Sequence, residues 1–318
     1  MRIGLVGAGS WGCALAETIC QKGHHLVWWV HEEDIAIALQ EKGRHPNIFP
    51  DHAYPLHQIE AITTDIRFVL KEAEVLLLAL PSRYISSVLS QADLPLRKPW
   101  ISATKGLLPE SSLRPTEYLR LRGITRFAVL SGPSYAEEVI QHRPTWVGLG
   151  TQDEELSRLA QETLQTEYFY LLPTKSINAL EWVGVLKNVY AIGIGAVSLL
   201  GDNVRAALAA YMLRELEWII GSWAPQEKID FLTPPWAGDF LVTAFGTQSR
   251  NQRFGQYLAQ GYPIRSALAR VGMVVEGYHA AQSLQERVTP EFPILYKLVQ
   301  ILTEKEPPEK LRYLIRET

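Results

Sequence analysis

The feature that most constrains this chain is a glycine pattern near its start. Residues 2–7 read RIGLVG, a short apolar run that ends in glycine, and residues 7–12 read GAGSWG before a helical pattern begins. A strand, a GxGxxG turn and a helix in this order are typical of a dinucleotide-binding unit. In such a unit Gly7 permits the tight turn, Gly9 lets the backbone approach a pyrophosphate, and Gly12 lets the helix pack on the strand. The sequence therefore predicts that this segment binds NAD or NADP.

The residue after the second predicted strand bears on which dinucleotide binds. NAD-binding units usually place an acidic residue about 20 residues beyond the turn, where it holds the ribose 2′-hydroxyl. Here the strand at residues 26–30 is followed by His31, and then by Glu32 and Glu33. A histidine does not repel a 2′-phosphate, so we expect NADP to be accepted, while the two glutamates keep NAD open. The alternative is that His31 is an exposed residue at a helix start and has no role in choosing the cofactor.

Apolar runs and helical patterns alternate along the first half of the chain. The predicted strands are residues 2–7, 26–30, 75–80, 100–104, 127–131, 145–150 and 168–172, and the predicted helices between them are residues 11–22, 32–42, 83–91 and 153–165. Residues 43–54, rich in proline and histidine, are predicted to form a loop. Beyond Pro173 only helical patterns remain, at residues 176–197, 203–220, 264–287 and 292–303. We expect an α/β fold, with an N-terminal Rossmann-type doubly wound sheet at residues 1–173 and an all-α C-terminal domain at residues 174–318.

The composition argues against a nucleic-acid-binding, metal-binding or membrane-spanning protein. The formal net charge is −3 with 20% charged residues, which lacks the basic excess of nucleic-acid-binding proteins. The two cysteines, Cys13 and Cys20, form no metal-binding motif, so we expect buried thiols and no metal. Apolar runs such as residues 75–80 are too short to span a bilayer, and no signal peptide precedes the first strand. We expect a cytoplasmic protein without a membrane span or a nucleic-acid partner.

Two polar segments follow predicted strands. Lys105 follows the strand at residues 100–104, and ligands of doubly wound sheets bind beyond the C-terminal ends of strands. Ser134 lies in SGPSYA (residues 131–136), where it is predicted to cap the helix that follows. The alternatives are that Lys105 is an ordinary loop lysine in solvent and that Ser134 has only the structural role of a helix cap.

The helical half contains a lysine in an unusual environment. Lys187 and Asn188 lie within the apolar helix predicted at residues 176–197, whose flanking residues indicate burial on nearly all sides. A lysine in an apolar helix usually extends its ammonium to solvent. If buried, it has a lowered pKa and can act as a general acid or base. Asp239 and Arg250 follow in the chain, and arginine suits bidentate phosphate binding.

The short motifs of this chain and their order along the sequence resemble those of bacterial-type NAD(P)-dependent glycerol-3-phosphate dehydrogenases. They are GAGSWG (7–12), LPS (80–82), SATKG (102–106), SGPSYAEE (131–138), LKNVYAIG (186–193), GDF (238–240), QSRNQRFG (248–255) and VVEGYHAA (274–281). The resemblance implies reversible hydride transfer between NAD(P)H and dihydroxyacetone phosphate, which gives sn-glycerol 3-phosphate for glycerophospholipid synthesis. It also implies a small phosphorylated substrate and a homodimer.

The resemblance also implies a role for each matching residue. Lys187 matches the catalytic lysine that protonates the ketone oxygen, and Lys105 and Asp239 match residues around the reacting carbons and hydroxyls. The other substrate positions are Gly132, Ser134, Ser249, Arg250 and Asn251, of which Arg250 and Asn251 match the phosphate clamp. The cofactor positions, besides the glycines of the turn, are Ser10, Trp11, His31, Lys105, Ala136, Arg250 and Glu276.

Two segments depart from the family pattern. The chain is shortened between Ala196 and Gly201, and residues 233–245 read TPPWAGDFLVTAF where a GLGDL-type loop is usual. These departures leave Lys187 and Asp239 in place, so they affect rate and affinity more than reaction type. The alternatives are a related two-domain dehydrogenase acting on a hydroxy acid or sugar phosphate, and a non-catalytic NADP-sensing protein.

Overall fold

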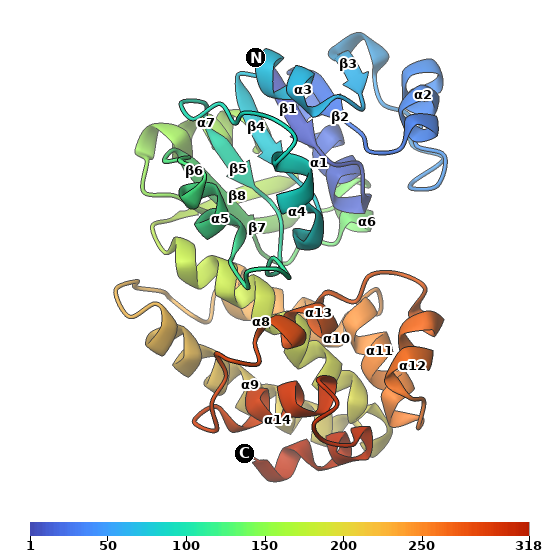
Figure 1. Ribbon diagram of the computed structural model, residues 1–318, viewed down its shortest axis with the longest axis vertical. Coiled ribbons are helices and arrows are strands. Elements are labelled where there is room, and N and C mark those ends of the chain that lie inside the picture. Colours follow the sequence, from blue (N-terminus) through green and yellow to red (C-terminus); the bar gives the residue numbers. More distant parts are fainter. Residues whose placement is uncertain (318) are drawn as a thin grey trace. The chain divides into compact units, whose positions relative to one another are not determined.

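The computed structural model describes residues 1–317, which form two compact units (Figure 1). The first unit comprises Met1–Thr104 and Arg114–Ile177, and the second comprises Lys105–Leu113 together with the chain from Asn178 onward. Lys105–Leu113 therefore belongs to the helical unit, although it follows a strand of the first unit in sequence.

The first unit is built on an eight-stranded sheet with the order β3-β2-β1-β4-β5-β6-β7-β8. The strands are β1 (Arg2–Val6), β2 (His25–Trp29), β3 (Ile59–Thr63), β4 (Val75–Leu78), β5 (Trp100–Ser102), β6 (Phe127–Ser131), β7 (Thr145–Gly150) and β8 (Phe169–Thr174). All neighbouring strands run parallel except the antiparallel pair β6 and β7. The strand order reverses between β1 and β4, the position at which doubly wound sheets bind ligands. The predicted fold class is confirmed.

The helices of the first unit connect these strands. They are α1 (Ser10–Gln21), α2 (Glu33–Lys42), α3 (Ile66–Glu72), α4 (Ser82–Leu89), α5 (Pro115–Leu121), α6 (Ala136–Val139) and α7 (Glu154–Leu164), with a short 3₁₀ turn at Leu56–Gln58. Cys13 and Cys20 are free, buried thiols on α1, as predicted. Among the strands and α-helices of this unit, β3, α3 and α5 were not predicted from the sequence.

The second unit contains no strand among its described residues. Its helices are α8 (Ile177–Ala196), α9 (Asp202–Trp223), α10 (Asp239–Phe245), α11 (Arg250–Ala259), α12 (Ile264–Val271), α13 (Glu276–Ser283) and α14 (Pro293–Leu302), with short helical turns at Ser198–Leu200, Pro234–Gly238 and Pro308–Glu317. The prediction of one helix over residues 264–287 is wrong. The backbone at Gly272 takes a left-handed conformation that ends α12, and α13 begins four residues later. Among residues 1–317, no helix is long and apolar enough to cross a membrane.

Three glycines let helices of the second unit approach α8 closely. A Cβ atom at Gly255 of α11 would lie 2.0 Å from the carbonyl oxygen of Ile192, and one at Gly195 would lie 2.1 Å from that of Gln252. At Gly277 of α13 a Cβ would lie 2.3 Å from the carbonyl oxygen of Asn188. Only glycine fits at such contacts. The first two turns of α11 are thus held against the C-terminal end of α8, and the start of α13 is held against its middle.

Candidate active site

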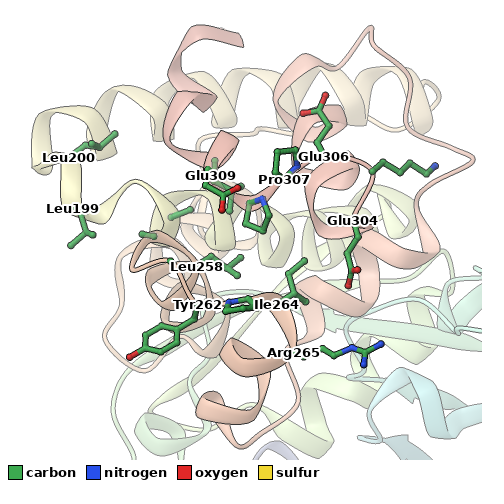
Figure 2. A pocket seen from close by; sticks show the side chains of 17 residues that line it. Leu199, Leu200, Leu258, Tyr262, Ile264, Arg265, Glu304, Glu306, Pro307 and Glu309 are labelled. Atoms are coloured by element: carbon green, nitrogen blue, oxygen red, sulfur yellow. The ribbon is translucent and has the colours of Figure 1, made fainter.

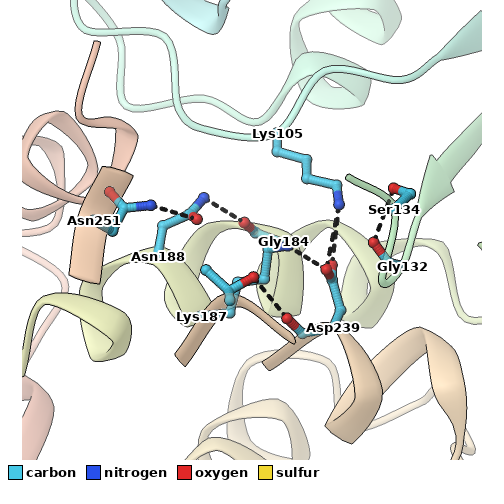
Figure 3. Close-up of polar contacts among 9 residues, drawn as sticks. Lys105, Gly132, Ser134, Gly184, Lys187, Asn188, Asp239 and Asn251 are labelled. Atoms are coloured by element: carbon cyan, nitrogen blue, oxygen red, sulfur yellow. Dashed lines mark hydrogen bonds and ion pairs between the residues drawn. The ribbon is translucent and has the colours of Figure 1, made fainter. Parts of the chain in front are cut away.

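Two lysines and one aspartate meet inside the second unit (Figure 3). Asp239, the first residue of α10, is fully buried, and Lys187 of α8 is 5% exposed. The Lys187 ammonium donates a hydrogen bond to Oδ1 of Asp239. Nζ of Lys105 lies 3.4 Å from Oδ1 and 3.2 Å from Oδ2 of the same carboxylate. The structure therefore brings together the three residues predicted to be catalytic.

The environment of Lys187 favours proton transfer near neutral pH. Burial lowers the pKa of Lys187 from 10.5 to about 7, and the positive charge of Lys105 acts in the same direction. The carboxylate of Asp239 opposes this shift, because it stabilises the charged ammonium. An acid with a pKa near 7 can both give and take a proton in neutral solution.

The segment before Asp239 forms a helical turn rather than an open loop. Residues Pro234–Gly238 make a π-helical turn that leads directly into α10, and Pro235 and Trp236 are buried. The hydroxyl of Thr243 donates a 2.8 Å hydrogen bond to the carbonyl oxygen of Asp239 one turn later. Pro235 and Trp236 of this unusual segment thus pack inside the unit, whereas Pro234 is exposed, and the turn leads into the helix that begins at the aspartate.

A chain of amide hydrogen bonds joins α8, α11 and α13. Nδ2 of Asn251 donates to Oδ1 of Asn188 at 2.9 Å (Figure 3). The backbone N–H of Gly277 donates to Oδ1 of Asn251 at 2.9 Å. Nδ2 of Asn188 in turn donates to the Gly184 carbonyl at 3.1 Å. This chain places the start of α11 beside the residue that follows Lys187. Asn188 was not among the predicted site residues, although a second polar residue in so apolar a helix was a visible signal.

The start of α11 carries three predicted substrate residues. Ser249 is the N-cap residue, and its hydroxyl accepts a hydrogen bond from the Gln252 N–H at 3.2 Å. Arg250 is the first helical residue, and none of the described residues forms a hydrogen bond or ion pair with its guanidinium. The first backbone N–H groups of a helix and an arginine together suit an anionic group.

The glycine turn of the first unit has the geometry that a dinucleotide requires. Gly7 has φ +118°, and a Cβ there would lie 2.7 Å from the Ala79 carbonyl oxygen. A Cβ at Gly12 would lie 2.3 Å from the Gly7 carbonyl oxygen, whereas one at Gly9 would have no neighbour within 4 Å. The first and third glycines are thus needed for the turn and the packing, and the second leaves its backbone open for close approach by a ligand. The buried indole Nε1 of Trp11 has no hydrogen-bond partner among the described residues. These residues fit a bound dinucleotide.

The other predicted residues of the first unit lie at loop and helix starts. His31 is exposed after β2, and Ser10 begins α1. The predicted capping role of Ser134 is wrong, because α6 begins at Ala136 without a side-chain cap and the Ser134 hydroxyl donates instead to the Gly132 carbonyl at 3.1 Å. In the second unit, Glu276 is the first residue of α13.

A separate pocket in the second unit contains none of the predicted site residues (Figure 2). Its volume is about 740 Å³, and its lining includes Leu199, Leu258, Tyr262, Ile264, Arg265 and Lys305. Three glutamates, Glu304, Glu306 and Glu309, line it as well, so its charge does not favour a phosphorylated substrate. Among residues 1–317 no group of three or more His, Cys, Asp or Glu residues is placed to hold a metal ion.

Comparisons with known proteins show which family the chain resembles along its length. The family model for the NAD-dependent glycerol-3-phosphate dehydrogenase N-terminus matches residues 2–157, and the one for the C-terminus matches residues 177–312. The chain is 32% identical to glycerol-3-phosphate dehydrogenase [NAD(P)+] of Syntrophotalea carbinolica over 97% of this chain and 95% of that protein. It is 33% identical to the enzyme of the same name from Limosilactobacillus reuteri over 96% of this chain and 94% of that protein.

A solved structure gives the same result for the fold. The crystal structure of glycerol-3-phosphate dehydrogenase from Coxiella burnetii superposes with a TM-score of 0.91 at 27% identity, covering 100% of this chain and 99% of that one. Two family models that together span most of the chain, and relatives above 30% identity over nearly its whole length, establish the family. The chain belongs to the NAD-dependent glycerol-3-phosphate dehydrogenases.

Proposed function

We propose that this protein interconverts dihydroxyacetone phosphate and sn-glycerol 3-phosphate by hydride transfer with NAD(P)H. The observation that carries the proposal is the buried contact of Lys187 and Lys105 with Asp239. Reduction of a ketone places negative charge on its oxygen, and that charge needs a cation and a proton close by. The relatives that this chain matches are named for the same dehydrogenase activity.

In this proposal Lys187 is the general acid. Its ammonium donates a proton to the ketone oxygen during reduction, and its neutral amine takes that proton back during oxidation. Asp239 orients the Lys187 ammonium through their hydrogen bond, and Lys105 adds positive charge at the same carboxylate. The nicotinamide, when bound, supplies or accepts the hydride. General acid catalysis of this kind contributes roughly 10²–10⁴-fold in rate.

The phosphate of the substrate is assigned to the start of α11. Arg250 offers a guanidinium without a partner among the described residues, and Asn251 is fixed by its bonds to Asn188 and Gly277. We assign Gly132, Ser134 and Ser249 to the remaining substrate contacts. The cofactor contacts we assign to the glycine turn with Ser10 and Trp11, and to His31, Lys105, Ala136, Arg250 and Glu276.

The wider setting is part of the same proposal. The protein acts in the cytoplasm as a homodimer and supplies glycerol 3-phosphate for glycerophospholipid synthesis. The exposed His31 after β2 favours acceptance of NADP beside NAD. Sedimentation of the purified protein measures the oligomeric state, and a monomer at micromolar concentration would contradict the dimer.

Replacement of Lys187 tests the catalytic assignment. We expect Lys187→Ala to abolish turnover of dihydroxyacetone phosphate and to leave the dissociation constant for NADPH unchanged, since the glycine turn is intact. Lys297→Ala is the matched control, because Lys297 is also a mostly buried lysine of the second unit and pairs with Glu306 at 2.8 Å. Substantial turnover by the Lys187 variant would contradict the assignment.

A substrate panel tests the reaction itself. Oxidation of NADPH and NADH is followed with three kinds of ketone. These are dihydroxyacetone phosphate, 2-oxo acids, whose reduction gives hydroxy acids, and ketose phosphates. We expect the highest kcat/KM with dihydroxyacetone phosphate. A preference for a 2-oxo acid or a larger sugar phosphate would favour a related dehydrogenase, and binding of NADPH without any turnover would favour a sensor.

A further inference from the structure

The exposed side of α9 carries few charges. Residues 206–222 have one side buried inside the second unit and one side exposed. The exposed residues are three alanines, Tyr211, Trp218, a glycine and a serine, together with Arg214 and Glu217, whose charges cancel. A helix side that faces water usually carries charged and polar residues throughout. Tyr211 is 42% exposed and Trp218 is 51% exposed, so this side of α9 has the character of an interaction surface.

Four of these residues are spaced to face a partner helix. They are Ala207, Tyr211, Arg214 and Trp218, which follow one another at intervals of four, three and four residues. Residues at these intervals form a stripe along a helix that a second helix can cover. We call these four residues the α9 stripe. Tyrosine, tryptophan and arginine are also the residue types that contribute most to the binding energy of protein interfaces.

The α9 stripe makes few contacts within its own chain. Among the described residues, none forms a hydrogen bond, an ion pair or a ring contact with Arg214 or Tyr211. Trp218 packs against Phe292 in a T-shaped arrangement with 5.3 Å between the ring centroids. This contact holds the indole in place, although half of the side chain remains exposed. The guanidinium and the phenol ring are therefore available to a partner.

The α9 stripe complements a second copy of itself when two α9 helices run antiparallel. A two-fold axis between residues 212 and 213 places Ala207 opposite the partner's Trp218, and Tyr211 opposite the partner's Arg214. The small alanine leaves room for the large indole, and a guanidinium over a tyrosine ring is an attractive pair. Symmetry makes each pair occur twice. A parallel arrangement would instead bring the two arginines together, which their like charges disfavour.

We propose that this side of α9 is the interface of a homodimer, in which two antiparallel α9 helices pair through the α9 stripe. The proposal rests on the homodimer of the proposed function, to which it adds the surface and the arrangement, and it is independent of the chemistry at Lys187. In the dimer Trp218 packs on the partner's Ala207, and Arg214 lies over the ring of the partner's Tyr211. Association then removes the exposed aromatic side chains from water.

An exchange of two side chains tests the interface. Tyr211→Arg places like charges opposite each other at two symmetry-related positions. We expect the dimer dissociation constant, measured by sedimentation equilibrium, to rise at least about tenfold. Arg214→Tyr alone removes both cation–ring pairs and should also weaken the dimer. In the double variant, Tyr211→Arg with Arg214→Tyr, each ring again faces a guanidinium, so the constant should return to within about threefold of the wild-type value.

A tyrosine outside the α9 stripe provides the control. Tyr84 is 44% exposed on α4 of the first unit, and we expect Tyr84→Arg to change the dimer dissociation constant by less than about twofold. Every variant should bind NADPH as the wild type does, since the glycine turn is intact. Calorimetry of that binding shows that each variant is folded.

Cysteine crosslinking tests the antiparallel arrangement. Ala207→Cys with Trp218→Cys places two thiols opposite each other across the two-fold axis, and we expect oxidation to give a covalent dimer. The two positions lie about 16 Å apart along one helix, so the disulfide cannot form within a chain. Ala207→Cys alone is the control, because the two copies of residue 207 lie equally far apart and should give no covalent dimer. The native Cys13 and Cys20 are buried.

Four outcomes would overturn the proposal. They are a dimer of Tyr211→Arg as stable as that of the wild type, an exchange variant as weak as Tyr211→Arg, no covalent dimer of the double cysteine variant, and a covalent dimer of Ala207→Cys alone. In each case the homodimer stands and this interface does not. A wild type that is monomeric at micromolar concentration would instead contradict the homodimer itself, so the two failures are distinguishable.

Discussion

At the scale of single residues, the candidate active site depends on three charged side chains that lie close together. Asp239 is fully buried and contacts two ammonium groups, Lys187 on one oxygen and Lys105 near both. Charges this close and this poorly solvated shift one another's proton affinity strongly. The two neighbours act on Lys187 in opposite directions, since Asp239 raises its pKa and Lys105 lowers it.

Opposite shifts in the pH profile follow from this arrangement. In the wild type kcat for ketone reduction should fall as the pH rises through about 7, where the Lys187 acid loses its proton. Lys105→Met removes a like charge, so the midpoint should move to higher pH. Asp239→Asn removes the stabilising carboxylate, so the midpoint should move to lower pH. The measurement is kcat for reduction against pH, and midpoints that moved in the same direction would contradict the arrangement.

A phosphate clamp at Arg250 predicts a selective loss of affinity. We expect Arg250→Ala to raise KM for dihydroxyacetone phosphate by at least about tenfold, since charge-assisted hydrogen bonds contribute about 1.5–3 kcal/mol each. KM for phosphate-free dihydroxyacetone should change far less. Arg253→Ala is the control, because Arg253 is an exposed arginine of the same helix. Equal effects on both substrates would argue against the clamp.

The burial of Lys187 was predictable from its apolar neighbours in sequence, whereas its partners were not. Asp239 lies 52 residues away in the chain, and Lys105 lies 134 residues from Asp239. Contacts across such separations depend on how helices pack, which residue patterns do not encode locally. The roles of these residues came from the resemblance of their motifs to a family, and not from spacing.

At the scale of elements, the sequence predicted those whose pattern is strong. The strand β4 is a continuous apolar run and was recognised, because both faces of a central parallel strand are covered. The strand β3 lies at the edge of the sheet, is only partly buried and contains Glu60, so it lacks that pattern. Helical periodicity also continues across Gly272, which concealed the break between α12 and α13.

The close packing of α8 and α11 gives a prediction at this scale. A Cβ at Gly255 would lie 2.0 Å from the Ile192 carbonyl, so Gly255→Ala forces the two helices apart. We expect a loss of about 1–3 kcal/mol in stability, the usual effect of overpacking, and a raised KM for dihydroxyacetone phosphate because Arg250 moves with its helix. The measurements are urea unfolding and steady-state kinetics.

A second glycine in the same unit provides the control. Gly221 is exposed on α9, and a Cβ there would have no neighbour within 4 Å. Gly221→Ala should therefore stabilise the protein by about 0.5–1 kcal/mol through helix propensity and leave KM unchanged. A stabilising effect of Gly255→Ala would contradict the close contact.

At the scale of the whole molecule, the order of elements predicted the fold class. Alternating strands and helices followed by helices alone predicted a doubly wound sheet and a helical region. The assignment of Lys105–Leu113 to the helical unit was not visible in sequence, because it depends on contacts with residues far along the chain. Global stability likewise depends on contacts between segments that are distant in sequence.

One such contact centres on Glu17 of α1. Its carboxylate is buried and bonds His52 from the loop after α2 at 2.9 Å and His142 from the segment after α6 at 2.8 Å. Burial opposes ionisation, but the hydrogen bonds from His52, Gln21 and His142 outweigh it and lower the pKa of Glu17 from 4.5 to about 2. Three segments of the first unit thus share one ionised carboxylate.

Acid should therefore destabilise the protein through this residue. A carboxyl group whose pKa is lower in the folded state contributes stability that is present above its unfolded pKa and is lost as the pH falls toward the folded value. For Glu17 that window runs from about 4.5 down to about 2, and the full contribution is up to about 3 kcal/mol. Glu17→Gln should be less stable than the wild type at neutral pH but should lose less stability between about pH 6 and pH 3.5. Glu41→Gln, at an exposed position on α2, should follow the wild-type curve. Urea unfolding at a series of pH values measures the difference, and equal acid sensitivity of wild type and Glu17→Gln would show that the carboxylate does not stabilise the fold.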